Sequence, residues 1–218
     1  MRRDPLHFAP LLRVLHWLMM AMIVTMLFIG VGMVSTTGSA YVTLLHLHRP
    51  LGIAILVLVA LRLLVRLATG APELPPDLDA PQRLAAKSSH VLLYAAMFAL
   101  PLIGWGMLSA GGYPVALSQA TVLPPILPHD LRLYAVLRFA HTWIALALFG
   151  LILLHLAAAL MHGLIRRDGV LQSMTWGDAR HDRHTPEHAP VPAPAADIAE
   201  RDEIAPPPPD ESDSPARD

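Results

Sequence analysis

The sequence contains no cysteine, which excludes several kinds of site at once. Disulfide bonds, thiolate zinc sites, iron–sulfur clusters and haem attached through a Cys-x-x-Cys-His motif all require that residue. Acidic residues are also scarce: only five of the 17 precede Asp168, and none lies inside a hydrophobic segment. A transporter for divalent cations or protons usually needs a carboxylate within the membrane, so this scarcity argues against a metal-ion transporter.

Hydrophobic residues make up 54% of the 218 residues, too large a share for an ordinary soluble domain. They form four segments, each long enough to cross a bilayer, at about residues 11–34, 42–67, 86–108 and 134–165. The first is far longer than the apolar part of a signal peptide, so we expect it to remain as a helix. The pattern predicts an all-α integral membrane protein, with a four-helix transmembrane up-down bundle over residues 1–176.

Polar or proline-rich stretches separate and follow these segments. Residues 68–81 form a connector that cannot continue a helix, and Pro101 is expected to kink the third segment. Residues 109–133 are expected to form an ordered loop or a short amphipathic helix on the membrane surface. Residues 177–218 are acidic and rich in proline, which predicts a disordered tail.

The positive charges near the segment ends predict the orientation. Nine Lys and Arg residues fall on the side that carries both termini, and three fall on the other side. Short loops rich in Lys and Arg stay in the cytoplasm, so we expect both termini to be cytoplasmic.

Twelve histidines are then the main candidates for a transition-metal site. His141 and His155 are fourteen positions apart in the last segment. On a helix this spacing corresponds to about 21 Å along the axis and nearly whole turns, so both imidazoles leave one face at two depths. By depth, His16 can meet His155 at the cytoplasmic side, and His48 can meet His141 at the outer side.

Each pair could hold a flat macrocycle between facing helices. Two imidazoles make a haem six-coordinate, which suits electron transfer because no position remains for a substrate. We therefore expect two noncovalent haem groups with bis-histidine ligation. Gly52, one turn after His48, would let a porphyrin approach the backbone. His46 lies on nearly the opposite face and could replace His48, although Gly52 favours His48.

Other polar residues allow a functional or a structural interpretation. His90 could contact a haem propionate, bind a quinone or lie at the interface, and His162 could handle quinone or protons. Arg62 and Arg66 share a helix face and either anchor the cytoplasmic end or bond a haem propionate. Trp17 is either an interfacial residue or a wall of the inner pocket.

The combined pattern resembles the bacterial cytochrome b561 family of four-helix di-haem membrane proteins over about residues 6–176. It includes these residues: Leu15, His16, Trp17 and Leu18; Leu47, His48, Gly52, Arg62 and Arg66; His90, Tyr94, Ala99, Leu100, Pro101, Gly104 and Gly106; His141, Leu154, His155, Ala157, Ala158, Ala159, Leu160 and His162. The resemblance implies four histidine ligands for two b haems, exchange of electrons with ubiquinone, and in some members superoxide as donor. It implies a quinone near His16, His162 and residues 68–87, where Lys87 would handle quinone or protons. The outer loop is proline-rich and poor in arginine, which departs from the pattern.

We therefore expect an oxidoreductase of the bacterial inner membrane that passes electrons from a periplasmic donor, a small molecule or a protein, to ubiquinone. Its other partner would be the lipid bilayer, and nothing indicates nucleic acid. An alternative is a membrane-anchor electron-transfer subunit of a larger dehydrogenase or hydrogenase, which would purify with that partner.

Overall fold

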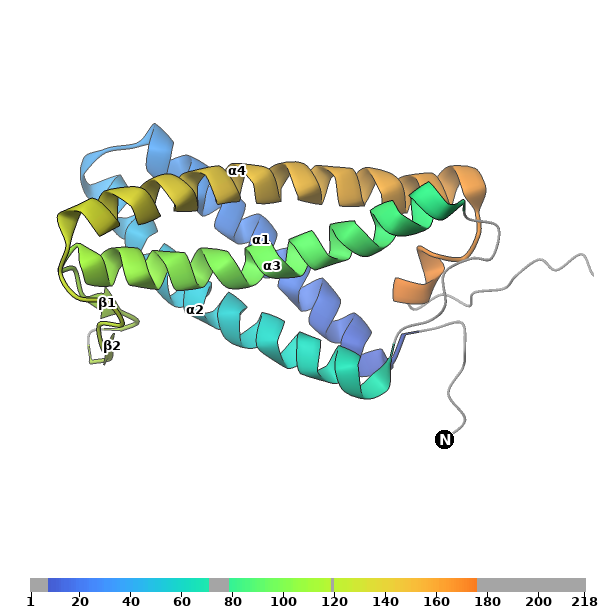
Figure 1. Cartoon of the computed structure of the whole chain (residues 1–218), viewed down its shortest axis with the longest axis horizontal. Helices are drawn as coiled ribbons and strands as arrows, with labels where there is room; N and C mark the ends of the chain where they lie inside the picture. The colour runs from blue at the N-terminus through green and yellow to red at the C-terminus, as the bar shows by residue number, and fades with distance from the viewer. Residues whose placement is uncertain (1–7, 71–78, 119, 176–218) are drawn as a thin grey trace, which may run out of the picture. The chain divides into compact units, whose positions relative to one another are not determined.

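The computed structural model describes residues 8–70, 79–118 and 120–175. Four long helices dominate these residues: α1 (Pro10–Ser35), α2 (Gly38–Thr69), α3 (Ala80–Ala110) and α4 (Leu131–Leu160) (Figure 1). All four are long and apolar enough to cross a membrane, as the sequence predicts. The predicted tail at residues 177–218 and most of the connector lie outside the described residues.

The helix ends follow local chemistry. Pro81 lies in the first turn of α3, where its fixed φ angle suits a helix start, so α3 begins at Ala80 rather than at residue 86. The carboxylate of Asp130 caps α4 by accepting hydrogen bonds from the backbone N–H groups of Arg132 and Leu133. A link of two residues, Thr36 and Thr37, joins α1 to α2 and makes them antiparallel.

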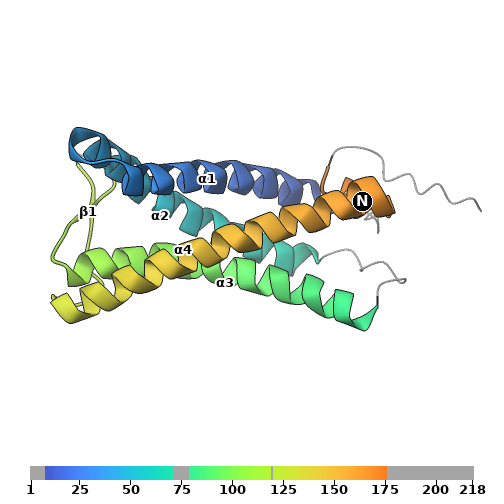
Figure 2. The same ribbon diagram turned by 90° about the horizontal axis from the view of Figure 1, so that it is seen from above.

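The helices pack as two close pairs, α1 with α2 and α3 with α4, and contacts between α2 and α3 join the pairs (Figures 1 and 2). Within the described residues, the backbone of α4 makes no extended close approach to α1 or α2. Side chains, among them the histidines of interest, therefore span the distance between α4 and those two helices.

The segment between α3 and α4 contains a small β-hairpin instead of an amphipathic helix. Strands β1 (Val115–Ala116) and β2 (Val122–Leu123) pair antiparallel, and β1 packs on α2 and α3. The indole N–H of Trp105 donates to the carbonyl of Pro124 at 3.0 Å, which ties the loop to α3. We call this end of the bundle the hairpin end, and the end where α1 begins and α4 finishes the terminal end.

At the terminal end, α4 continues through a π-helical turn, η1 (Met161–Arg166), and the chain then reverses. Residues 167–175, which we call the return segment, include the short 3-10 helix η2 (Gln172–Met174) and pack back on α1. The Trp17 indole donates to the carbonyl of Met174 at 2.9 Å, and Arg13 donates to the carbonyl of Thr175 at 2.7 Å. A Cβ atom on Gly163 would lie 2.3 Å from a Leu171 side-chain carbon, so a larger residue would have to displace Leu171.

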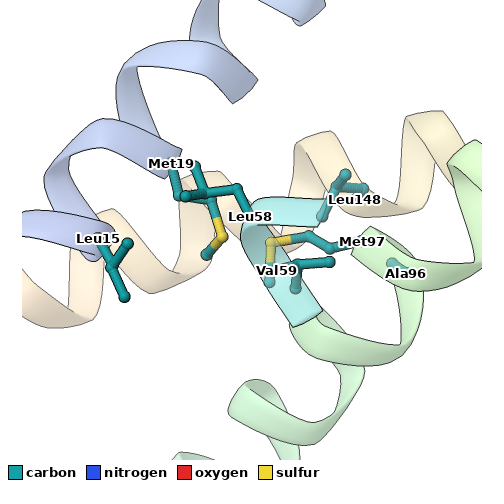
Figure 3. Close-up of a cluster of buried hydrophobic side chains, with 7 residues drawn as sticks. All are labelled: Leu15, Met19, Leu58, Val59, Ala96, Met97 and Leu148. Carbon is teal, nitrogen blue, oxygen red and sulfur yellow. The ribbon is translucent and has the colours of Figure 1, made fainter. Parts of the chain in front are cut away.

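The apolar core draws on all four helices (Figure 3), and its member Leu148 lies near the middle of α4. Its buried members are Leu15, Met19, Leu58, Val59, Ala96, Met97 and Leu148. Leu148 is seven residues from both His141 and His155. The core therefore separates the two depths at which those histidines lie.

Candidate functional site

The hairpin end brings His48 of α2 and His141 of α4 together. Their ring centres are 6.1 Å apart, and the planes are inclined by 60°. Nδ1 of each ring is buried without a hydrogen-bond partner among the described residues. The backbone carbonyl of Leu100 in α3 lies beside the His141 imidazole but outside hydrogen-bond geometry. His46 instead lines a hollow of about 390 Å³ beside the hairpin, so the structure places His48, not His46, opposite His141.

The terminal end brings His16 of α1 and His155 of α4 together in the same way. Their ring centres are 6.4 Å apart, with planes inclined by 73°. The edge of Trp17 contacts His16 at a centroid distance of 6.1 Å. Because the Trp17 indole also bonds Met174, this residue joins the histidine to the return segment.

The spacing of each pair suits two axial ligands of one metal ion. With a metal–nitrogen bond of about 2 Å and a nitrogen about 1.2 Å from its ring centre, two imidazoles on opposite sides of one ion have centres at most about 6.4 Å apart. The described residues hold no group of three or more His, Cys, Asp or Glu side chains able to bind a metal ion. A haem iron needs only two protein ligands because its porphyrin supplies four nitrogens, so the two pairs fit haem and not a bare ion.

Arg62 of α2 is a buried cation beside the terminal-end pair, with only 4% of its surface exposed. Its guanidinium donates to the hydroxyl of Tyr94 and, at 3.2 Å, to Nδ1 of His16. Nε of Arg62 has no partner, and no carboxylate pairs with it among the described residues. Burying a charge without an opposite charge is costly, so this site favours an anionic group such as a haem propionate.

The contact with Arg62 also fixes the tautomer of His16 in this arrangement. Arginine only donates, so Nδ1 of His16 is the acceptor and its proton is on Nε2. An imidazole that binds metal through Nε2 carries its proton on Nδ1 instead. His16 can therefore serve as a ligand once Arg62 exchanges this contact for another acceptor, and a carboxylate would provide one.

Arg66, one turn further along α2, shares Tyr94 with Arg62. The two guanidinium carbons lie 5.7 and 5.4 Å from the Tyr94 ring centre, and these distances suit cation–π contacts. Tyr94 thus positions both arginines, a role that the sequence did not indicate.

His90 of α3 lies beside the terminal-end pair of His16 and His155 rather than at a free helix end. Its ring centre is 5.6 Å from that of His155, and its Nδ1 lies 2.7 Å from the carbonyl oxygen of Ala86. Lys87, which we expected near the quinone, is exposed and makes no hydrogen bond or ion pair within the described part of the chain.

His162 pairs with Asp168 of the return segment. Nδ1 of His162 lies 2.5 Å from Oδ2 of Asp168, and Nε of Arg166 lies 3.4 Å from the same oxygen. Arg167 (φ 51°) and Gly169 (φ 82°) are left-handed and turn the chain back at this point. The sequence analysis did not identify Asp168 as a partner of His162. Its only signal was that Asp168 is the first acidic residue after Asp130.

A glycine of α3 lies against the hairpin-end pair. A Cβ on Gly104 would lie 3.3 Å from Cε1 and 3.6 Å from Nδ1 of His141. Gly52, which we expected to admit a porphyrin, faces Met26 of α1, whose Cε would lie 3.7 Å from an added Cβ. Gly104 is therefore the glycine whose missing side chain gives the imidazole its room.

Replacing Gly104 by alanine should displace the His141 imidazole, because the added methyl leaves a contact tighter than van der Waals packing. Overpacking of this kind costs about 1–3 kcal/mol. We expect a weaker hairpin-end metal site and an altered optical spectrum of the purified protein. Gly150→Ala is the matched control, since no atom lies within 4 Å of the added Cβ there. Equal spectra for the two variants would contradict this role.

The paired imidazoles and the buried arginine fit the haem sites that the family resemblance of the sequence implies. Residues 7–177 match the family described as prokaryotic cytochrome b561. The chain belongs to this family. It is 30% identical over 169 residues to cytochrome b561 homolog 1 of Escherichia coli (strain K12), covering 73% of this chain and 92% of that protein.

The chain is also similar to two further proteins. Cytochrome b561 homolog 2 of the same strain is 27% identical over 161 residues, which cover 73% of this chain and 86% of the relative. A protein of Yersinia pestis described as probable superoxide oxidase CybB is 31% identical over 132 residues, covering 59% of this chain and 72% of its own length. As a family member, the chain is a multi-pass bacterial membrane protein that binds haem b and transfers electrons.

Proposed function

We propose that the protein carries electrons across the inner membrane from a periplasmic donor to ubiquinone through two haem b groups. The observation that carries this proposal is the presence of two imidazole pairs, 6.1 and 6.4 Å apart, at opposite ends of the apolar core. His48 and His141 would hold one haem, and His16 and His155 the other. When bound, haem supplies reversible one-electron chemistry.

The remaining residues of each site would bind and orient the groups. Arg62 and Arg66 would bond the propionates at the terminal end, where the buried charge of Arg62 lacks an anion among the described residues. Trp17 would form a wall of that pocket, because its ring edge contacts His16. Two imidazoles on each iron would leave no open position, which favours electron transfer over substrate binding.

Loss of Arg62 should weaken haem binding at the terminal end. A hydrogen bond to a charged group contributes about 1.5–3 kcal/mol, so Arg62→Leu should lower the affinity of that haem about 10- to 100-fold. Haem dissociation from the purified protein to an apoprotein acceptor measures this effect, and Arg62→Lys should give a smaller one. Arg132→Leu, an exposed change at the hairpin end, is the control. Equal dissociation rates in Arg62→Leu and the wild type would exclude a propionate contact.

The charge at the two ends supports a cytoplasmic terminal end. Seven Lys and Arg residues of the described chain lie there, and three lie at the hairpin end. The seven are Arg13, Arg62, Arg66, Arg83, Lys87, Arg166 and Arg167; the three are Arg49, Arg132 and Arg138. By the positive-inside rule the hairpin end faces the periplasm.

Quinone reduction would then occur at the terminal end, near His162. Asp168 holds Nδ1 of His162, which leaves Nε2 to exchange a proton with a reduced quinone oxygen. Lys87, exposed at the start of α3, could supply protons from solvent. A quinone takes up protons as it is reduced. The His162–Asp168 pair would supply these protons, which the haems cannot.

Superoxide is our candidate for the donor. One relative is described as a probable superoxide oxidase, and Arg49, Arg132 and Arg138 lie at the hairpin end. Their positive charge would attract a small anion toward the His48–His141 pair.

The deciding experiment is the haem content and the reduced-minus-oxidised spectrum of the purified protein, followed by stopped-flow mixing with superoxide and a soluble quinone. We expect about two noncovalent low-spin b haems per chain. Reduction of the haems by superoxide and their reoxidation by quinone would support the full proposal. A single haem, or haems that neither reagent oxidises or reduces, would contradict it.

A further inference from the structure

Three imidazoles cluster at the terminal end, those of His16, His90 and His155, although a haem iron takes only two. His90 is closer to His155 than His16 is, with ring centres 5.6 Å apart against 6.4 Å. His90 belongs to α3, the helix that packs closely on α4. Its position beside a proposed ligand therefore needs an explanation.

The hydrogen bond to Ala86 fixes the tautomer of His90. A carbonyl oxygen only accepts, so Nδ1 of His90, 2.7 Å from the Ala86 oxygen, must carry the proton. In a neutral imidazole the other nitrogen, Nε2, is then an acceptor. His90 thus offers a lone pair within the cluster, and its own orientation is set by α3.

His155 has the complementary need. If it binds iron through Nε2, its proton is on Nδ1, and histidine ligands almost always donate this N–H to a carboxylate, a carbonyl or a similar acceptor. Within the described residues, no hydrogen bond is formed by the His155 imidazole, not even to the carbonyl one turn back in α4. Arg62 and Arg66, the charged groups that act on His90, are donors only and cannot accept it.

We propose that His90 is a positioning residue for His155: its Nε2 accepts the Nδ1 proton of His155, while the carbonyl of Ala86 holds its own ring in place. This inference rests on the proposed haem site at the terminal end. The contact would fix the ring of His155 and raise its basicity, which favours the ferric form of the haem. It would account for His90 without a direct contact to iron, propionate or quinone.

The test compares His90→Asn with His90→Gln in the full-length, haem-loaded protein. An asparagine amide can replace Nδ1 at the Ala86 carbonyl but is too short to replace Nε2, whereas a glutamine oxygen can reach the position of Nε2. The readouts are the haem content, the midpoint potentials of both haems and the g-values of the ferric haems in electron paramagnetic resonance. The His141→Ala variant, which should keep only the terminal-end haem, shows which potential and which g-values belong to that haem. Val91→Ala, a lipid-facing neighbour, is the control.

We expect His90→Asn to keep both haems, to raise the midpoint potential of the terminal-end haem and to shift its g-values. His90→Gln and Val91→Ala should resemble the wild type. Unchanged signals in His90→Asn, or equal shifts in the Asn and Gln variants, would overturn the proposal. Loss of the terminal-end haem in His90→Asn would also overturn it, because His90 would then be a ligand itself. Loss of haem on replacing His155 or His16 tests the haem site separately.

Discussion

Replacing His141 by alanine is expected to remove the haem at the hairpin end and to leave the other haem bound. The two proposed sites lie at positions of α4 about 21 Å apart, and the core around Leu148 separates them. Loss of a residue that hydrogen-bonds a metal ligand lowers metal affinity about 10–100-fold, so loss of the ligand itself should lower it more. Haem content and the optical spectrum of the purified variant measure the result. The proposed electron transfer from the periplasmic side to quinone should also cease.

His155→Ala should give the opposite result, with the terminal-end haem lost and the hairpin-end haem retained. His46→Ala is the matched control, because His46 is two residues from His48 but lies beside the hairpin. It should keep both haems, whereas His48→Ala should behave like His141→Ala. Retention of two haems in either α4 variant would refute the pairing, and loss of haem in His46→Ala would exchange the roles of His46 and His48.

His162→Ala should keep both haems but slow quinone reduction about 100-fold, the lower end of what general acid–base catalysis contributes. The side chain belongs to the π-helical turn and bonds Asp168, and it is not paired with another imidazole in the described structure. Its removal should therefore leave the haem spectrum unchanged. Stopped-flow reoxidation of the reduced protein by a soluble quinone isolates this step from the reaction with the donor.

Asp168→Asn provides a second measurement at the same dyad. An amide can still contact Nδ1 of His162 but carries no charge to stabilise a protonated ring, so we expect a smaller decrease than in His162→Ala. His129→Ala, an exposed histidine at the hairpin end, should reoxidise like the wild type. A wild-type rate in His162→Ala would remove this residue from the quinone site.

The sequence determined the features that depend on position along a single helix. Hydrophobic length predicted the four spans, and the spacing of fourteen between His141 and His155 predicted two depths on one face of α4. Because antiparallel helices put residues of matching depth side by side, the same reasoning predicted which histidines face each other. The structure brings those pairs together.

Only the tertiary structure decided features that arise between segments far apart in the chain. The proximity of His90 to His155 depends on how α3 rotates against α4, and the room that Gly104 gives His141 depends on the same packing. The His162–Asp168 pair depends on a chain reversal, held by Trp17 and Arg13 more than 150 residues away. Periodicity gives the depth of a residue in a membrane helix, but rotation, tautomer and chain reversal are set by packing with distant residues.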